Sequence, residues 1–246
     1  MGAPRAVLFD LRGTLIDVSS GWRLTDDERI RFLRSCGAEG SDAYLRRALS
    51  EAVAQVNEIA RHRREFLDQD RLVLELVAGK VGLTIAPERI DAFEEWRNKL
   101  FVRAVEAYPD AAITLLGLRI ERVVTGCVAD GHTRWVRLAL RQAGLLDLLD
   151  VIVASEESGE VKATGAALRL ACARAGLEPE DVVFVGDRLD KDVAMARAAG
   201  ARAVLLDRDT ALPPSATSIW SLAEIPNWQF ETRRETHRWS TSTTSS

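Results

Sequence analysis

Few features of this 246-residue sequence point to an unusual environment. Its three cysteines, Cys36, Cys127 and Cys172, are an odd number and lack the spacing of a metal site. Small buried side chains in a reducing compartment are the ordinary role of such cysteines. No apolar stretch is long enough to cross a bilayer, and the N-terminus lacks the apolar segment of a signal peptide. We therefore expect a cytoplasmic protein that makes no contact with membranes.

A large net charge of either sign is also absent. The formal net charge is −4 and the isoelectric point is near 5.6, which gives no reason to expect binding to nucleic acid. Apolar residues, in contrast, make up 47% of the chain. A chain of this length and composition can bury one α/β core together with a smaller inserted unit.

The most informative features are two short apolar runs: Ala6–Phe9, which ends at Asp10, and Val182–Val185, which ends at Gly186 and Asp187. Such β-branched runs are typical of buried parallel strands. Because open α/β sheets bind ligands at the carboxyl ends of their strands, adjacent strands here would bring Asp10 and Asp187 together. Clustered carboxylates repel one another unless a cation lies between them, and oxygen ligands alone suit Mg²⁺. The pattern predicts a metal-assisted site with Asp10 as the candidate nucleophile.

Four motifs follow one another along the chain in the order and spacing of a known family. They are Asp10–Leu15, Thr125, Lys162, and Gly186-Asp187 with Asp192. Together they resemble the haloacid dehalogenase-like (HAD) superfamily, and Tyr108-Pro109 ahead of the second motif resembles the subclass with a helical cap after the first motif. The first motif of that family is D-x-D-G-T-L, and the only departure from it is Arg12 in place of the second Asp. The resemblance covers roughly residues 5 to 208.

The resemblance implies a doubly wound parallel sheet, a Rossmann-type α/β core, with an inserted helical cap domain. Residues 1–16 and 107–225 would form the core and residues 17–106 the cap. Helical and strand patterns alternate after Tyr108, which agrees with βαβ units. Residues 226–246 are polar and low in complexity, which predicts a disordered tail.

Residues 17–106 show helical patterns and no strand pattern. Thr25–Glu28 has the form of a capping box at the start of the first helix. Ser41 can cap a second helix, a third is expected over Leu72–Val81, and Pro87 can open a fourth. We therefore expect four helices in this block.

Most members of the resembled family are Mg²⁺-dependent phosphatases that form an aspartyl-phosphate. The resemblance makes Asp10 the nucleophile and assigns phosphate binding to Thr125, Gly126 and Lys162. Lys162 is one of only four lysines in a chain that otherwise uses arginine, which favours a point charge chosen for a phosphoryl oxygen. A small anionic metabolite is the expected substrate.

The resemblance also implies the ligands of a Mg²⁺ ion. They are the carboxylates of Asp10, Asp187 and Asp192 and the backbone carbonyl of Arg12. Asp190 is an alternative to Asp192, although it can equally be the N-cap of the next helix.

Arg12 sets this chain apart from the resembled phosphatases. In that family the second Asp protonates the leaving oxygen and later deprotonates water, and an arginine can do neither. Loss of general acid–base assistance slows a reaction by about 10²–10⁴-fold. The Arg12 guanidinium can leave the metal site intact, or it can take the place of the metal between Asp10 and Asp187.

Three classes of function follow. The first is a phosphatase acting on a small phosphorylated metabolite, with impaired or altered acid–base chemistry. The second is a hydrolase of substrates with good leaving groups, such as an acyl phosphate or a halide, as in dehalogenases. The third is a disabled scaffold with a binding or regulatory role.

The histidines show no pairing with a nucleophile. His62, His132 and His237 are therefore expected at the surface. The run Arg61–Arg64 is expected on a solvated helix face, with an anion-attracting patch as the alternative.

Overall fold

The computed structural model describes residues 4–209 and 218–227. Its centre is a six-stranded sheet in the order β5-β4-β1-β6-β7-β8, in which every neighbouring pair is parallel. The strands are β1 (Ala6–Phe9), β4 (Val124–Ala129), β5 (Val151–Ala154), β6 (Val182–Gly186), β7 (Arg202–Leu206) and β8 (Ser218–Ile219). The fold class is thus confirmed as an α/β doubly wound parallel sheet.

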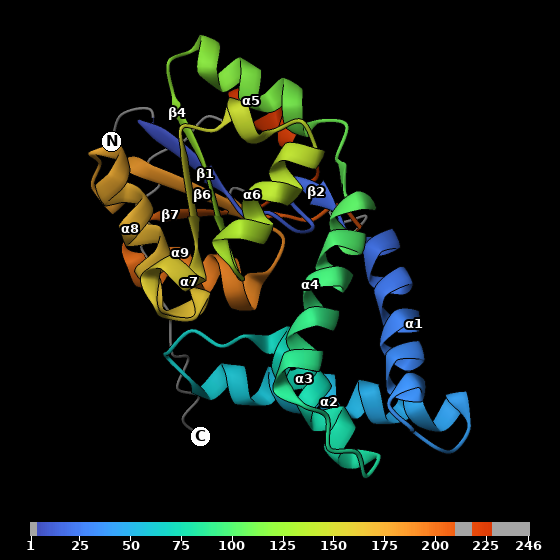
Figure 1. Ribbon diagram of the computed structural model, residues 1–246. Coiled ribbons are helices and arrows are strands. Elements are labelled where there is room, and N and C mark those ends of the chain that lie inside the picture. The colour runs from blue at the N-terminus through green and yellow to red at the C-terminus, as the bar shows by residue number, and fades with distance from the viewer. Residues whose placement is uncertain (1–3, 210–217, 228–246) are drawn as a thin grey trace, which may run out of the picture.

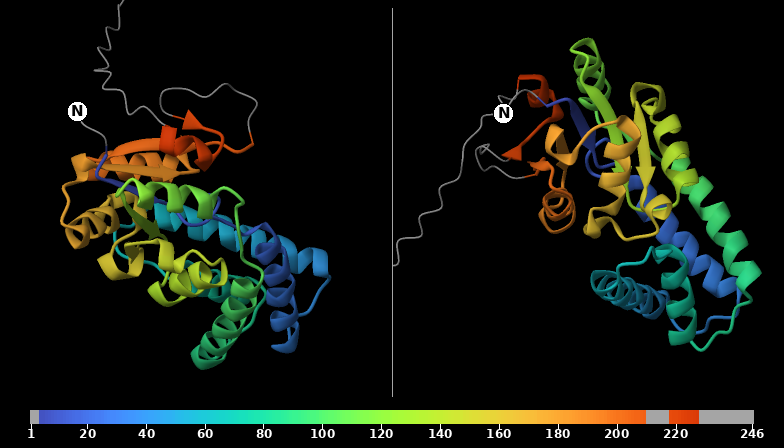
Figure 2. Two further views of the ribbon diagram at one scale, coloured as in Figure 1. Left: turned by 90° about the horizontal axis from the view of Figure 1, so that it is seen from above. Right: turned by 90° about the vertical axis from the view of Figure 1, so that its left-hand side faces the viewer.

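Helices cover both faces of this sheet (Figures 1 and 2). One face packs against α5 (Ala111–Ile120) and α6 (Thr133–Gln142), and its core includes Val7 and Phe9. The other face packs against α8 (Ala166–Ala175) and α9 (Ala194–Ala199), and its core includes Ala6 and Leu8. Successive residues of a strand point to opposite faces, so a strand covered on both sides must be apolar throughout. This is why β1 and β6 read as unbroken apolar runs.

Short 3₁₀ and α-helical turns complete the core. They are η1 (Leu146–Leu148), α7 (Ser155–Ser158), η2 (Lys162–Thr164), η3 (Pro179–Asp181) and η5 (Leu222–Asn227), with a π-helical turn, η4 (Leu189–Val193), after β6. Among the described residues, none of the helices combines the length and apolarity that a membrane span requires.

Between two short strands, β2 (Ile16–Asp17) and β3 (Glu106–Ala107), the chain forms four helices with a hydrophobic core of their own. They are α1 (Ser19–Ser35), α2 (Asp42–His62), α3 (Gln69–Lys80) and α4 (Pro87–Arg103). We call residues 19–103 the helical insert. Figure 1 shows it gathered on one side of the sheet, joined to the core through the antiparallel β2–β3 pair.

The starts of these helices test the capping predictions. Ser41 is the N-cap of α2 and its side chain accepts from the backbone N–H of Tyr44, and Pro87 stands in the first turn of α4, both as predicted. The capping box at Thr25–Glu28 is wrong, because α1 already begins at Ser19 and Thr25 is buried inside it. The Asp17 carboxylate accepts from the N–H of Ser19 at 2.8 Å, which supplies an earlier start for the helix.

Two other predictions concern the cysteines and the tail. Cys127 and Cys172 are buried and unbonded, and Cys36 is half-buried. Residues 226 and 227 close η5. The remainder of the tail expected over residues 226–246 lies outside the described residues.

Candidate active site

The site is built where β1 and β6 end side by side. Phe9 pairs with Val185, and the N–H of Asp10 donates to the carbonyl of Val185 at 2.8 Å, so the turns after the two strands are held together. Gly13 has a φ of +79°, and a Cβ there would lie 2.3 Å from an oxygen of Asp187. The turn therefore requires glycine both for its conformation and for the approach of Asp187.

Three carboxylates gather at this point. Asp10, Asp187 and Asp192 each offer an oxygen, and these oxygens all lie within 4.8 Å of one another. Asp192 rather than Asp190 is the second acid, because Asp192 is buried while Asp190 is exposed and bonded to Arg188. The N–H of Arg188 donates to Asp192 at 3.0 Å and fixes that carboxylate in place.

The environment of the cluster disfavours negative charge. Burial raises the pKa of Asp10 to about 7, Lys162 lowers it, and Asp192 and Asp187 add to the increase. Burial, followed by the neighbouring Asp192, raises the pKa of Asp187 to about 6. A cation held among the three would relieve this repulsion. An all-oxygen donor set of this kind fits Mg²⁺.

Lys162 is the cation that contacts the cluster directly. Its ammonium is buried, donates to Asp10 and to Asp192 (2.7 Å for the latter), and lies 5.1 Å from the centre of the Phe184 ring. Burial alone would lower the pKa of Lys162, but the charges of Asp10 and Asp192 outweigh it and raise that pKa. Lys162 is therefore charged and bonded to the predicted nucleophile.

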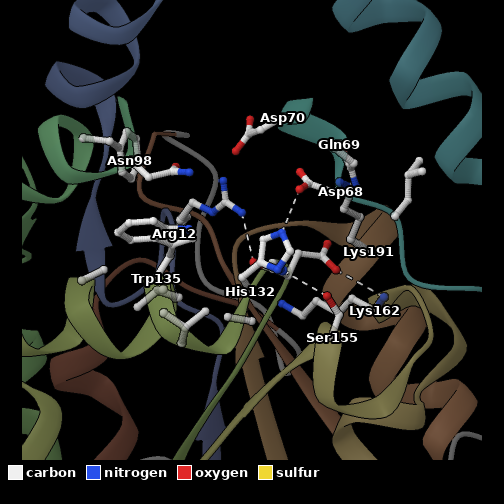
Figure 3. Close-up of a pocket in the computed structure, with 18 of the residues that line it drawn as sticks. Arg12, Asp68, Gln69, Asp70, Asn98, His132, Trp135, Ser155, Lys162 and Lys191 are labelled. Carbon is white, nitrogen blue, oxygen red and sulfur yellow. Dashed lines mark hydrogen bonds and ion pairs between the residues drawn. The ribbon is translucent and has the colours of Figure 1, made fainter. Parts of the chain in front are cut away.

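Arg12 extends toward the helical insert, on the side where Asp70 lies (Figure 3). Its Nη2 donates to the backbone carbonyl of Asp130 at 3.1 Å. Its charge also joins those of Arg97 and Arg29 in acting on Asp70 of the insert, whose pKa they lower to about 2 against the effect of burial. The sequence left two placements open for the guanidinium: outside the metal site, or in the place of the metal between Asp10 and Asp187. This orientation favours the first placement.

The structure does not bring Thr125 and Gly126 to the site, which corrects their assignment to phosphate binding. Thr125 pairs with Val7 near the start of β4, and its hydroxyl donates to the carbonyl of Leu148 at 2.8 Å. A Cβ on Gly126 would lie 2.4 Å from Val151, so this glycine serves close strand packing. The strand β4 continues to Ala129. Asp130 and Gly131 directly follow its carboxyl end and line the site.

A cavity of about 500 Å³ opens between these residues and the insert. Core residues that line it but were not predicted include Asp130, Gly131, His132 and Ser155, and insert residues include Asp68, Asp70 and Arg97. The apolar run Cys127–Ala129, followed by Asp130-Gly131, is the signal that could have identified the true strand end. His132, expected at the surface, instead bonds to carboxylates from two parts of the chain.

Comparison with known proteins defines the class. Residues 4–200 match the family described as haloacid dehalogenase-like hydrolase. The chain belongs to this family of enzymes. Among curated relatives it is 31% identical over 211 residues to the glyceraldehyde 3-phosphate phosphatase of Methanopyrus kandleri, a match that covers 83% of this chain and 84% of the relative.

The chain is also similar to a dehalogenase in sequence and to a solved hydrolase in structure. The (S)-2-haloacid dehalogenase 1 of a Pseudomonas species is 26% identical over 229 residues, covering 90% of this chain and 95% of the relative. The HAD-hydrolase YfnB from Bacillus subtilis, solved bound to magnesium, superposes with a TM-score of 0.72 over 92% of this chain and 98% of that one. At 15% identity this second likeness concerns the fold alone.

Proposed function

We propose that this protein is a Mg²⁺-dependent phosphatase of a small phosphorylated metabolite, with Asp10 as nucleophile and the helical insert as its cap. The observation that carries the proposal is the convergence of Asp10, Asp187 and Asp192 with the ammonium of Lys162 at one cavity. Nucleophile, candidate metal ligands and a cation for phosphoryl oxygens are the groups that phosphoryl transfer needs. The cavity volume of about 500 Å³ is within the usual range for small-molecule sites.

The chemistry has two steps. A carboxylate oxygen of Asp10 attacks phosphorus, the bond to the leaving oxygen breaks, and the leaving group takes that electron pair. Water then attacks the phosphorus of the aspartyl-phosphate, the bond from phosphorus to Asp10 breaks with its electron pair returned to the carboxylate, and the inorganic phosphate keeps the protons of the water. Lys162 holds the Asp10 carboxylate and balances charge on the phosphoryl group.

Asp10, Asp187, Asp192 and the Arg12 carbonyl would hold Mg²⁺, which supplies further neutralisation of the phosphoryl charge when bound. Asp192 reaches this position while bonded to Lys162 and to the N–H of Arg188. Asp192 would thus contact both the Lys162 ammonium and the metal.

Arg12 determines which esters should react. Because its guanidinium cannot protonate the leaving oxygen, the barrier rises with the pKa of the leaving group. Aryl and acyl phosphates are therefore favoured over alkyl phosphates. Phosphatase relatives that act on small phosphorylated compounds, including one named phosphoglycolate phosphatase, support the substrate class.

Dehalogenation is the second candidate, because a halide needs no proton on leaving. The full-length likeness to a haloacid dehalogenase favours it. Asp187 and Asp192, which provide a donor set for a metal, favour phosphatase activity.

A screen of aryl, acyl and alkyl phosphates and of 2-haloacids, with and without Mg²⁺, tests the proposal. We expect Mg²⁺-dependent release of phosphate that is fastest for aryl and acyl esters. Asp10→Asn should abolish it, while Asp190→Asn, which alters an exposed carboxylate on the turn that carries Asp192, should not. Halide release without Mg²⁺ would establish the dehalogenase instead, and wild-type rates in Asp10→Asn would refute the nucleophile. A chain that binds phosphate yet turns over no ester would be the disabled scaffold.

A further inference from the structure

His132 is bonded on both sides of its ring, once to the core and once to the insert. Its Nδ1 lies 2.8 Å from Glu156 in α7, and its Nε2 lies 3.0 Å from Asp68, which precedes α3. Carboxylates only accept, so a ring with both nitrogens protonated satisfies both bonds. The bond to Asp68 is the largest influence on the pKa of His132 and, with that to Glu156, raises it to about 9 although burial opposes the charge. His132 is therefore a cation at neutral pH.

The segment of the insert that His132 meets is also bonded to the core through its backbone. We call residues 64–68 the strap. The N–H of Phe66 donates to Gly159 at 2.8 Å, and the N–H of Val161 donates to Arg64 at 2.7 Å, around an antiparallel bridge of Glu65 with Glu160. The ring of Phe66 also lies edge-on to His132, with the ring centres 5.2 Å apart.

The strap contacts the loop that presents Lys162. Val161, whose N–H is bonded to the strap, directly precedes Lys162. The N–H of Lys162 donates to Asp130 at 3.3 Å, and its ammonium contacts Asp10 and Asp192. Release of the strap would remove two backbone hydrogen bonds that order residues 159–161, next to the lysine.

We propose that His132 is a positioning residue that fastens the strap to the core, closes the insert over the cavity and thereby orders the loop that carries Lys162. Its consequence for catalysis rests on the role proposed above for Lys162. The charged groups that contact the ring are Asp68 and Glu156. Other charged groups on the neighbouring cavity wall include Arg12, Asp70, Asp130, Lys162 and Lys191 (Figure 3), and the Arg64–Glu160 pair lies along the strap.

Backbone hydrogen exchange tests the proposal without any need for turnover. His132→Gln removes the charge and retains a side chain that can form one hydrogen bond. His62→Gln is the matched control, since His62 also bonds a carboxylate, Glu58 at 3.0 Å, but both side chains are exposed and lie in the same helix. At pH 7.5 we expect about tenfold faster exchange over residues 62–68 and 158–165 in His132→Gln than in the wild type, and no change over residues 158–165 in His62→Gln.

The dependence on pH separates a charged fastener from general destabilisation. After correction for intrinsic rates, exchange of the strap in the wild type should accelerate as pH rises through about 9, because His132 then loses its proton. The His132→Gln variant should lack that acceleration. Equal pH responses in the two proteins would overturn the proposal, as would unchanged exchange in either segment.

Asp68→Asn provides a second, conservative variant. The Asp68 side chain caps α3 by accepting from the N–H of Arg71 at 3.1 Å, and an asparagine oxygen can do the same. The charge pairing with His132 is then lost while the cap is retained. We expect Asp68→Asn to accelerate strap exchange in the wild type and to add little in the His132→Gln background. Additive effects would contradict a direct pair.

Kinetics then decide the link to Lys162. With the screened aryl phosphate, His132→Gln should lower kcat more than it raises KM, because a misplaced lysine acts on the reacting group. Faster exchange with an unchanged kcat would overturn that link. If the wild type hydrolyses no ester, the proposed function fails, while exchange over residues 158–165 still decides whether His132 orders the loop.

Discussion

At the scale of the residue, position 12 holds an arginine where the first motif of the resembled family has its second Asp. The structure has a cation beside Asp10, the proposed nucleophile, but it is Lys162, while Arg12 turns toward Asp130 and the insert. Position 12, which holds the acid–base group in the resembled phosphatases, thus carries an arginine whose side chain faces the helical insert. Under the proposed function, the Arg12 side chain cannot protonate the leaving oxygen of an ester.

Restoring a carboxylate at this position should therefore increase activity. We expect Arg12→Asp to raise Mg²⁺-dependent turnover of a generic aryl phosphate by about tenfold, equivalent to about 1.4 kcal/mol of barrier. Steady-state kinetics at saturating Mg²⁺ measure this. Arg119→Asp is the matched control, because Arg119 also donates to a backbone carbonyl, that of Asp147, but in a different region.

Unchanged or lower activity in Arg12→Asp, with folding and Mg²⁺ binding intact, would contradict this expectation. The guanidinium would then have a function of its own. A loss confined to the natural substrate would indicate that Arg12 binds an anionic group of that substrate.

At the scale of the element, capping and strand length explain both the successes and the errors of sequence analysis. Ser41 and Pro87 mark helix starts through contacts within one turn, and the structure confirms both. The placement of Thr125 at a strand end was wrong. A hydroxyl residue after an apolar run resembles the end of a strand, but β4 extends to Ala129. Where a strand ends depends on its neighbours in the sheet, which the run by itself does not specify.

The N-cap of α2 allows a quantitative prediction. Ser41→Ala removes the acceptor for the N–H of Tyr44 and should cost about 1 kcal/mol. For a chain of this size that corresponds to a decrease of about 2–4 °C in Tm, measured by calorimetry.

Ser50→Ala is the control for this change, since Ser50 is exposed within the same helix. Alanine is the better helix former, so this substitution should leave Tm equal or slightly higher. Equal effects of the two substitutions would show that Ser41 does not act as a cap.

At the scale of the whole molecule, buried charges hold the insert together on the side that faces the core. Asp70 accepts from Arg29 at 3.0 Å and from Arg97 at 2.9 Å, and both arginines are almost fully buried. These arginines, together with Arg12, keep the pKa of Asp70 near 2, well below its ordinary 3.8. Three helices of the insert thus share one carboxylate.

The sign of the resulting pH dependence follows from linkage. A carboxyl whose pKa is lower in the folded state contributes stability above its unfolded pKa of about 3.8, and loses it as pH falls toward about 2. Asp70→Asn should therefore lower Tm clearly at pH 6, and its difference from the wild type should shrink as pH falls from about 4 toward about 2. Thermal unfolding across this range measures the difference.

Asp91→Asn, which alters the exposed partner of Arg71, should show a smaller difference from the wild type at pH 6. A deficit in Asp70→Asn that stays constant with pH would mean that Asp70 stabilises by packing rather than by charge.

The sequence by itself determined the parallel sheet, the position of Asp10 and Asp187 at strand ends, and two of the four helix starts in the insert, at Ser41 and Pro87. These features depend on periodicity, capping and turn chemistry, which act between near neighbours in the chain. Only the tertiary structure decided the direction of Arg12, the place of Asp130 at the end of β4, and the pairing of His132 with Asp68, 64 positions away. The direction of Arg12 and the pairing of His132 depend on contacts between segments that are far apart in the chain, so they exist only once those segments have packed, and no local pattern encodes them.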